Sequence, residues 1–482
     1  MDTLAETVNP TKLQSDMRKV ASTTRKTGVA KKSIASLFKP ADLREHFLYS
    51  RAMEAVLWGM PVVHFDRIYQ ALVQDVNGGM NEILYWSQPS GWKNQMLTPD
   101  PDAVYFIPFF DMKETGPVVL KIPPAHEGSI VGSINDCWQN ALEDVGVTGV
   151  DAGKGGEYLI VPPGFTGYIT DSYIPLRSNY YRGYAVLRST VNGSDDADNA
   201  VSFGRQIELY PLSVASNRRP TIFTDAADVV FDPAVKYDVG FFQSLNRMIQ
   251  YEPWLNRDKV MIDILKTIGI EKDKPFKPDL HTEEILDAAA HDARRWLDSH
   301  FENSFPRFYK DRQWVVAAPH GVIETMGTQF ETANDYPVDE RGLNYSYSFS
   351  SAKDMNAERF ILFTLRDKLG EPLEGAMNYC LTIPPNVPVS KHWSIAVYDR
   401  KTHAFIRNVS HAGRSSQSPK LKKNADGSTD IFFGRTAPLG KEENWIPTAA
   451  NGSFEVCARF FGAQKALIER MWSLRDIEKL KM

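Results

Sequence analysis

The stretch HWSIAVYD, residues 392–399, alternates apolar with polar or small side chains, which is the period-two pattern of a half-buried strand. A turn sequence, NADGS, follows at residues 424–428, and a second strand sequence, DIFFG, at residues 430–434. SFEVCARF, residues 453–460, then has the pattern of a closing strand. Because these strands and turns alternate, the chain from Leu373 onward is expected to form an antiparallel β-domain with one short helix near its end.

The first half of the chain contains a similar series of strand patterns. Residues 117–122, 129–134, 157–161 and 184–188 are apolar stretches bounded by Gly, Pro or Asp. Successive strands without helices between them favour an antiparallel sheet or sandwich over a doubly wound fold. The expected fold class is therefore mainly β with helical additions, made of two antiparallel β-sandwich or jelly-roll-like domains.

Helical patterns lie before and between the two β-rich blocks. An amphipathic pattern covers residues 41–60, and we expect Gly59 and Pro61 to end this helix before a second one at residues 64–76. Three further helices are expected at residues 241–251, 259–268 and 282–300. The predicted organisation is a flexible N-terminal arm (1–40), a β-sandwich domain with N-terminal helices (41–235), a helical connecting segment (236–310) and a second β-sandwich domain (311–482).

The composition argues against several classes of protein. The 482 residues carry a formal net charge of −5, which is too small to indicate general nucleic-acid binding. The three cysteines, Cys137, Cys380 and Cys457, lie far apart, so neither a disulfide framework nor a thiolate zinc site is expected. No apolar run approaches the ~20 residues that span a bilayer, and no secretory signal is recognisable. We expect a cytoplasmic protein without membrane contact that forms a homodimer.

Standard catalytic signatures are missing from the sequence. It has no GxSxG elbow, no GxxxxGK[ST] phosphate loop, no HExxH and no GxGxxG after a strand. The ten histidines form no close metal-binding pair, and a divalent metal held by distant ligands is a weaker alternative. We therefore expect no cofactor and consider first a cofactor-independent enzyme that acts on a small molecule.

Two segments of the first half combine carboxylates with aromatic groups. TPDPDAVY, residues 98–105, is a rigid proline-containing loop that enters a strand and presents Asp102 and Tyr105. INDCWQN, residues 134–140, places Asp136 at the end of a strand. Paired carboxylates can perform acid–base catalysis if burial raises the pKa of one, so Asp102, Tyr105 and Asp136 are the catalytic candidates. The alternative is that both aspartates cap turns or helices.

The candidates for substrate binding are His64, Trp138, Arg188, Trp393 and Arg414. Arg188 and Arg414 could clamp an anion, because a guanidinium group grips a carboxylate or phosphate through two hydrogen bonds. For His64 the alternative is a buried histidine with satisfied hydrogen bonds. Arg459, by contrast, is expected to hold a neighbouring strand or loop.

Blocks of sequence in both halves resemble a known pair of domain families. The blocks are residues 116–123, 136–139, 153–164 and 173–178 in the first half, and 307–314, 393–399, 424–428, 440–445 and 460–462 in the second. In this order they resemble proteins with a DUF1254 domain followed by a DUF1214 domain, some of which are labelled virulence-associated. The resemblance covers about residues 45–480 and implies two β-sandwich domains with helical additions. It implies no catalytic residues.

The chain departs from these relatives in the loop at residues 98–105. Relatives usually have Thr-Pro-Asn, then a polar residue and Thr before the Tyr, whereas this chain has Asp100 and Ala103. If the loop lines the site, the substrate or the chemistry of this protein differs from that of its relatives.

Two functions of different classes are consistent with these residues. The first is a hydrolase or lyase with its site at the inner faces or the junction of the two domains, where Asp102 or Asp136 is the acid or base and Tyr105 donates a proton. Asp136→Ala would then abolish turnover and leave the melting temperature within a few degrees. The second is a non-catalytic module that binds glycans or proteins, with Trp393 and Trp445 exposed to the ligand.

Overall fold

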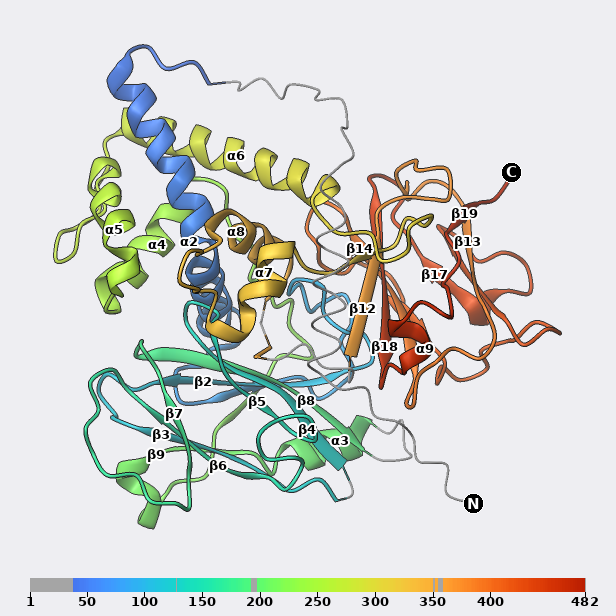
Figure 1. Cartoon of the computed structure of the whole chain (residues 1–482), viewed down its shortest axis with the longest axis horizontal. Coiled ribbons are helices and arrows are strands. Elements are labelled where there is room, and N and C mark those ends of the chain that lie inside the picture. Colours follow the sequence, from blue (N-terminus) through green and yellow to red (C-terminus); the bar gives the residue numbers. More distant parts are fainter. Residues whose placement is uncertain (1–37, 127, 192–196, 350–351, 354–358, 482) are drawn as a thin grey trace.

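Two β-sandwiches and a layer of helices make up the structure, a computed structural model that describes residues 38–126, 128–191, 197–349, 352–353 and 359–481 (Figure 1). The helices cover one face of the N-terminal sandwich, and the C-terminal sandwich lies beside both. The expected fold class is confirmed, because the sheets are mostly antiparallel and carry helical additions. The predicted N-terminal arm lies outside the described residues except for its last three, 38–40.

The N-terminal sandwich pairs a six-stranded sheet, in the order β10-β1-β2-β8-β4-β5, with a four-stranded sheet, β7-β6-β3-β9. The strands are β1 (Ile83–Tyr85), β2 (Val104–Asp111), β3 (Val118–Ile122), β4 (Gly128–Asp136), β5 (Ala141–Val145), β6 (Gly156–Val161), β7 (Ile174–Arg177), β8 (Arg182–Val191), β9 (Glu208–Pro211) and β10 (Phe223–Asp225). Alternate residues of a strand point to opposite faces. Phe106 and Leu187 therefore pack between the two sheets, whereas Tyr105 and Val186 face the helices.

The C-terminal sandwich pairs a five-stranded sheet, β11-β12-β18-β14-β15, with a four-stranded sheet, β17-β16-β13-β19. The strands are β11 (Val315–Val316), β12 (Arg359–Thr364), β13 (Tyr379–Ile383), β14 (Trp393–Asp399), β15 (Gly413–Ser415), β16 (Thr429–Gly434), β17 (Trp445–Pro447), β18 (Phe454–Phe461) and β19 (Glu478–Lys479). Phe454 of β18 packs against Tyr379 and Phe433 of the second sheet, with ring centroids 5.7 and 6.1 Å away. The face of β18 that carries Phe454 therefore belongs to the core of the sandwich.

The helical layer is built around the long helix α2. The layer contains α2 (Leu43–Val76), α4 (Val239–Tyr251), α5 (Lys259–Leu265), α6 (Leu280–Asn303), α7 (His320–Thr325) and α8 (Val338–Tyr347). The short helices α3 (Ala197–Gly204) and α9 (Lys465–Ile468) lie instead with the N-terminal and the C-terminal sandwich (Figure 1). Helices α4, α6 and α8 pack against α2, which is buried over most of its second half. Within the described ranges, no helix is long and apolar enough to cross a membrane.

Helix α2 continues through Gly59 and Pro61, so the prediction that these residues end a helix is wrong. A proline inside a helix removes one N–H donor and leaves the carbonyl group four residues earlier, here that of Leu57, without its usual partner. Gly342 of α8 packs so closely on this carbonyl oxygen that a Cβ at that position would be only 2.6 Å away. Tertiary packing of α8 on α2 therefore outweighs the local cost of the proline.

Candidate functional site

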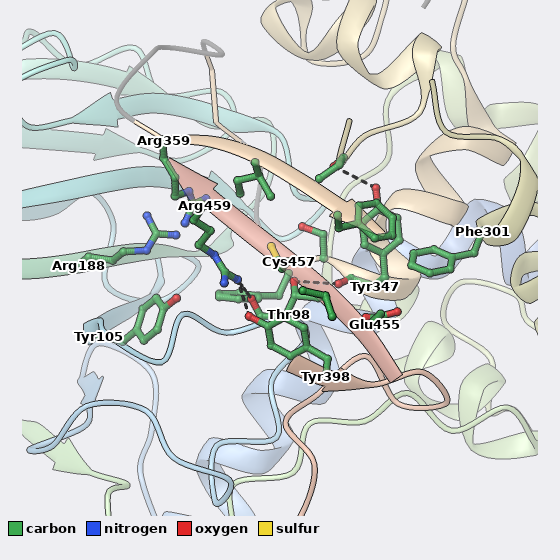
Figure 2. A pocket seen from close by; sticks show the side chains of 16 residues that line it. Thr98, Tyr105, Arg188, Phe301, Tyr347, Arg359, Tyr398, Glu455, Cys457 and Arg459 are labelled. Carbon is green, nitrogen blue, oxygen red and sulfur yellow. Dashed lines mark hydrogen bonds between the residues drawn. The ribbon is translucent and has the colours of Figure 1, made fainter. Parts of the chain in front are cut away.

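A cavity of about 90 Å³ lies where the two sandwiches and the helical layer meet (Figure 2). The N-terminal sandwich contributes Thr98 from the loop before β2, Tyr105 from β2 and Arg188 from β8. Residues 347–349, at and after the end of α8, form a second wall. Strands β12, β14 and β18 of the C-terminal sandwich form most of the rest, and Phe301 of α6 and Ala317 complete the lining. Because all three parts of the fold contribute, the cavity depends on their mutual packing.

Strands β12 and β18 each turn one row of alternate side chains toward the cavity. The rows are Arg359, Ile361 and Phe363 on β12 and Glu455, Cys457 and Arg459 on β18. Residues two apart on a strand share a face, and Ile361 lies directly opposite Arg459 in the antiparallel register. The other face of β18, which carries Phe454, is used by the sandwich core. Glu455, Cys457 and Arg459 are therefore buried by the neighbouring parts of the fold, and Arg359 is half-buried.

Three arginines from three different strands converge at one end of the cavity, Arg188, Arg359 and Arg459 (Figure 2). Burial and the neighbouring cations of Arg188 and Arg459 lower the pKa of Arg359 to about 10. Among the described residues, Arg188 and Arg359 have no carboxylate within 4.0 Å and no hydrogen-bond acceptor. The guanidinium of Arg188 instead faces the ring of Tyr105, 5.5 Å from its centroid. This end of the cavity thus carries excess positive charge.

Arg459 also holds the proline-containing loop against the C-terminal sandwich. Its Nη2 donates hydrogen bonds to the carbonyl oxygens of Thr98 (2.9 Å) and Pro99 (3.4 Å) and to Oη of Tyr398 (2.6 Å). Its Nε lies 4.0 Å from Oδ2 of Asp100. The loop is pinned in this way, as the sequence analysis expects of Arg459. Its Nε and Nη1 find no hydrogen-bond acceptor in the described part of the chain.

Tyr105 is the cavity phenol whose proton is available. Its Oη accepts a hydrogen bond from the backbone N–H of Asp100 at 3.0 Å, and no described residue accepts its own hydroxyl hydrogen. Tyr398, in contrast, donates to the carbonyl oxygen of Pro99 at 2.5 Å, and burial raises its pKa well above the usual value. Tyr105 can therefore donate a hydrogen bond or a proton to a bound molecule, whereas Tyr398 is committed to the loop.

A buried carboxylate, Glu455, lies at the opposite end of the cavity from the arginines (Figure 2). Its side chain is 3% exposed, and both of its oxygens are 3.1 Å from Nδ1 of His403. The ring of Phe301 closes this end, 4.5 Å from the His403 ring and 5.0 Å from that of Tyr347. The cavity therefore has a cationic end and a carboxylate end, with apolar side chains such as Ile361 between them.

The chemistry of these side chains suits an organic anion better than a metal cofactor. Guanidinium and phenol groups donate hydrogen bonds, and arginine is the residue that binds carboxylates or phosphates through two parallel bonds. In the described ranges, no three His, Cys, Asp or Glu side chains are grouped so as to hold a metal ion.

Of the candidates named from the sequence, Tyr105 and Arg188 line the cavity, where they lie opposite each other on neighbouring strands β2 and β8. The others lie elsewhere: His64, Asp102, Asp136, Trp138, Trp393 and Arg414. The structure thus brings together Tyr105, the proposed proton donor, and Arg188, a proposed anion clamp. It places Asp102 and Asp136 outside the cavity.

Asp136 is enclosed in the turn that follows β4. Its Oδ1 accepts hydrogen bonds from the backbone N–H groups of Trp138 (2.8 Å) and Asn140 (3.1 Å), and its Oδ2 accepts one from Nδ2 of Asn140 (2.8 Å). Burial raises its pKa to about 6, although these hydrogen bonds act in the opposite direction. Asp136 therefore organises a turn, which is the alternative use recognised in the sequence. Its removal is now expected to lower the melting temperature as well.

His64 and Trp138 are core residues of the helical layer. His64 lies fully buried in α2, and burial lowers its pKa to about 3. Neither ring nitrogen has a hydrogen-bond partner of good geometry among the described residues. Trp138 packs on Trp58 and Tyr180, with ring centroids 4.6 and 6.2 Å away. Neither side chain reaches the cavity, so a role in substrate binding has no structural support.

Asp102, Trp393 and Arg414 occupy the surface or the C-terminal sandwich. Asp102 is exposed on the loop, and Trp393 is only 6% exposed at the start of β14. Arg414 donates from Nε to the carbonyl oxygen of Glu443 at 2.9 Å, so its guanidinium holds a backbone segment. Trp445 is half-buried, and its Nε1 donates to a backbone carbonyl oxygen. These two indoles do not form the exposed platform that glycan binding would require.

Sequence patterns alone did not indicate a site role for Arg359, Tyr398, His403 or Glu455, and they indicated only a structural role for Arg459. One signal was present in SFEVCARF, where Glu455, Cys457 and Arg459 alternate with apolar residues. Such a pattern normally marks a solvent-facing row of a strand. Only the packing of the first domain against this row shows that it is buried.

Comparison with known proteins agrees with the two-domain organisation. Residues 80–211 match the family described as "Protein of unknown function (DUF1254)", and residues 358–465 match "Protein of unknown function (DUF1214)". No curated protein matches the chain in sequence.

Two solved structures are similar to the chain. The VPA0106 protein from Vibrio parahaemolyticus has a TM-score of 0.56 and 17% identity, over 90% of this chain and 100% of that one. An uncharacterized protein from Burkholderia cenocepacia has a TM-score of 0.41 and 10% identity, over 98% of this chain and 95% of that one. At 17% identity the first similarity shows a shared fold. The two family matches lie in the order that the sequence blocks predicted, DUF1254 before DUF1214.

Proposed function

We propose that the cavity between the two domains binds a small organic anion, whose carboxylate group is held by Arg188, Arg359 and Arg459. The observation that carries this proposal is that Arg188 and Arg359 face one cavity without a carboxylate partner among the described residues. Holding like charges together away from bulk water is costly unless a counter-charge is present. A carboxylate supplies that charge and can accept paired hydrogen bonds from a guanidinium group.

The size and walls of the cavity favour a short organic molecule. A cavity of 150 Å³ can hold benzene, so one of about 90 Å³ has room for roughly four to six non-hydrogen atoms. Beside the arginines the walls are apolar or aromatic, with Ile361, Phe349 and Phe363 among them. Inorganic phosphate would leave this apolar surface without a partner, whereas the hydrocarbon part of a short carboxylic acid would cover it.

The hydrolase or lyase activity expected from the sequence is retained in this proposal, with Tyr105 as the proton donor. Its hydroxyl hydrogen has no acceptor among the described residues and lies beside the arginines. A phenol in this position can protonate a leaving group or a carbanion formed on the bound acid. Asp102 and Asp136 take no part in this proposal, because neither lines the cavity.

Titration calorimetry of the full-length chain with acetate, propanoate, butanoate and inorganic phosphate tests the binding proposal. We expect at least one carboxylate to bind, and Arg188→Met and Arg359→Met each to weaken its binding at least tenfold. Arg414→Met is the control, because Arg414 lies outside the cavity, and it should leave binding unchanged. If no carboxylate binds, or if the cavity variants bind as well as the parent, the proposal is wrong. Tighter binding of phosphate would replace the carboxylate with a phosphate ligand.

The catalytic part has its own test once a ligand is found. Tyr105→Phe should bind that ligand within about threefold of the parent and convert it at least about a hundredfold more slowly, as expected for loss of a general acid. The cytoplasmic location and the homodimer remain predictions from the sequence, to be tested by cell fractionation and by light scattering.

A further inference from the structure

The carboxylate end of the cavity has no role in the proposed anion binding, although its carboxylate, Glu455, is well defined by its burial and its partner. Glu455 is 3% exposed, so its charge is removed from bulk water. Its partner among the described residues is Nδ1 of His403, at 3.1 Å from each oxygen. A carboxylate has about four lone-pair positions, and one imidazole N–H cannot fill them. Glu455 therefore keeps acceptor capacity toward the cavity that it lines.

Aromatic rings surround this acceptor. The rings of Phe301 and Tyr347 line the cavity beside Glu455, with centroids 5.0 Å apart, and Phe301 also packs on His403. Aromatic faces attract cations through the ring quadrupole, and more strongly where water is excluded. A carboxylate combined with aromatic walls is the chemistry that selects an ammonium group over a neutral hydroxyl group.

The two ends lie on the same strand and are therefore at a defined separation. Glu455 and Arg459 are four residues apart on one face of β18, which places their Cα atoms about 13 Å from each other. Both side chains line the same cavity (Figure 2), so one bifunctional molecule within it can contact both. Between them the cavity is lined by Ile361 and Cys457, which suits a short hydrocarbon linker.

We infer that the ligand is a small amino acid, with its carboxylate at Arg188, Arg359 and Arg459 and its ammonium group at Glu455, beside the rings of Phe301 and Tyr347. This inference rests on the proposed anion binding and adds the second functional group of the ligand. The two sets of side chains select a zwitterion, because a plain carboxylic acid would leave Glu455 facing a hydrocarbon chain and a plain amine would leave the arginines unpaired.

Calorimetry with matched ligand pairs tests the inference on the full-length chain. The pairs are acetate and glycine, and propanoate and β-alanine, whose members all have no more than six non-hydrogen atoms. We expect one amino acid of this series to bind at least tenfold more tightly than its plain partner. The length that binds best reports the distance between the two ends of the cavity. The corresponding hydroxy acid of that length should bind no better than the plain acid.

Two variants assign the preference to the residues that cause it. Glu455→Gln keeps the size of the side chain and removes its charge. It should reduce the preference for the amino acid over the plain acid to threefold or less, because the counter-charge of the ammonium group is lost. Phe301→Leu keeps an apolar wall and removes the ring, and it should reduce the preference by a smaller factor. Melting temperatures and circular dichroism spectra establish that both variants are folded.

The outcomes separate this inference from the proposal on which it rests. If plain carboxylates bind and no amino acid of the series binds more tightly, the inference is wrong and anion binding stands. If the preference survives Glu455→Gln in a folded variant, Glu455 is not the ammonium site and the inference is also wrong. If hydroxy acids bind as tightly as amino acids, the class of ligand is a hydroxy acid instead. If no carboxylate of any kind binds, the proposed function itself fails.

Discussion

Asp136 at the end of β4 is fully buried and Arg359 at the start of β12 is half-buried in the cavity wall; both are charged, but their partners differ. Asp136 accepts three hydrogen bonds from Trp138 and Asn140, so its charge is satisfied within one turn. Arg359 has neighbouring cations and apolar walls, and no described residue accepts a hydrogen bond from it. Burial alone therefore does not distinguish a functional group from a structural one. A buried charge whose partner is missing from the fold indicates a place for a ligand.

The largest effect on stability is expected at Asp136, whose hydrogen bonds are all made within the protein. Asp136→Ala should lower the free energy of unfolding by about 3 kcal/mol at pH 8, because it leaves two backbone N–H groups and an amide in the interior without an acceptor. Thermal and chemical denaturation measure this loss. Asp102→Ala, at an exposed position, is the matched control and should change stability by about 0.5 kcal/mol or less. If the Asp136→Ala protein is as stable as its parent, Asp136 does not have the structural role assigned to it.

A second prediction contrasts an arginine with partners and one without. Arg341 is 2% exposed and donates from Nη2 to the carbonyl oxygen of Trp138 at 2.8 Å, so Arg341→Met should destabilise the protein by about 2 kcal/mol. Arg359→Met should leave the unliganded protein as stable as the parent or stabilise it by about 1 kcal/mol, since it removes repulsion from Arg188 and Arg459. Denaturation without added anions measures both. Equal destabilisation by the two variants would show that Arg359 is structural.

A third prediction concerns His64, a buried polar group that has neither a network nor a cavity. Its folded-state pKa of about 3 is below the ordinary value of 6.5, so the unfolded chain takes up a proton first as the pH falls. This group therefore contributes stability that is complete above about pH 6.5 and is lost progressively toward pH 3. At pH 5 the loss is about 2 kcal/mol, from the 1.5-unit difference between this pH and 6.5.

His64→Leu should remove that loss, so the stability difference between variant and parent should grow in favour of the variant as the pH is lowered from 7 to 5. The described carboxyl groups with raised pKa, which are Asp136, Glu252, Asp258, Glu340 and Asp476, act in the opposite direction and are present in both proteins, so they cancel in the difference. If the difference in unfolding free energy between His64→Leu and the parent is the same at pH 7 and at pH 5, His64 is not buried as an uncharged imidazole.

The loop at residues 98–105 shows how far local sequence could lead. Its prolines and its entry into a strand predicted a rigid segment, and Thr98 and Tyr105 do line the cavity. The residue that departs from the relatives, Asp100, is buried 4.0 Å from Nε of Arg459. That contact joins positions 359 residues apart in sequence, so no local pattern could predict it. The exposed Asp102, two residues further on, shows why the carboxylates of the loop could not be ranked from the sequence.

The continuous helix α2 illustrates the opposite error. Gly59 and Pro61 are reliable helix-ending residues where only local propensity acts. Here the close approach of Gly342 from α8, nearly 300 residues later in sequence, buries the segment and keeps it helical. The cost of a proline is a few kcal/mol, which packing along a buried helix of 34 residues can exceed.

The sequence by itself determined several strands of both halves, the order of the two family resemblances and the rigid loop, because period-two patterns, turn residues and proline act over a few neighbouring positions. Tertiary structure alone decided which face of each strand became core and which became cavity. Glu455, Cys457 and Arg459 form a polar row that any single strand would turn to solvent, and the packing of the first domain encloses it. The site arises from the approach of β8, β12 and β18, and an approach between distant segments leaves no periodic signal in the chain.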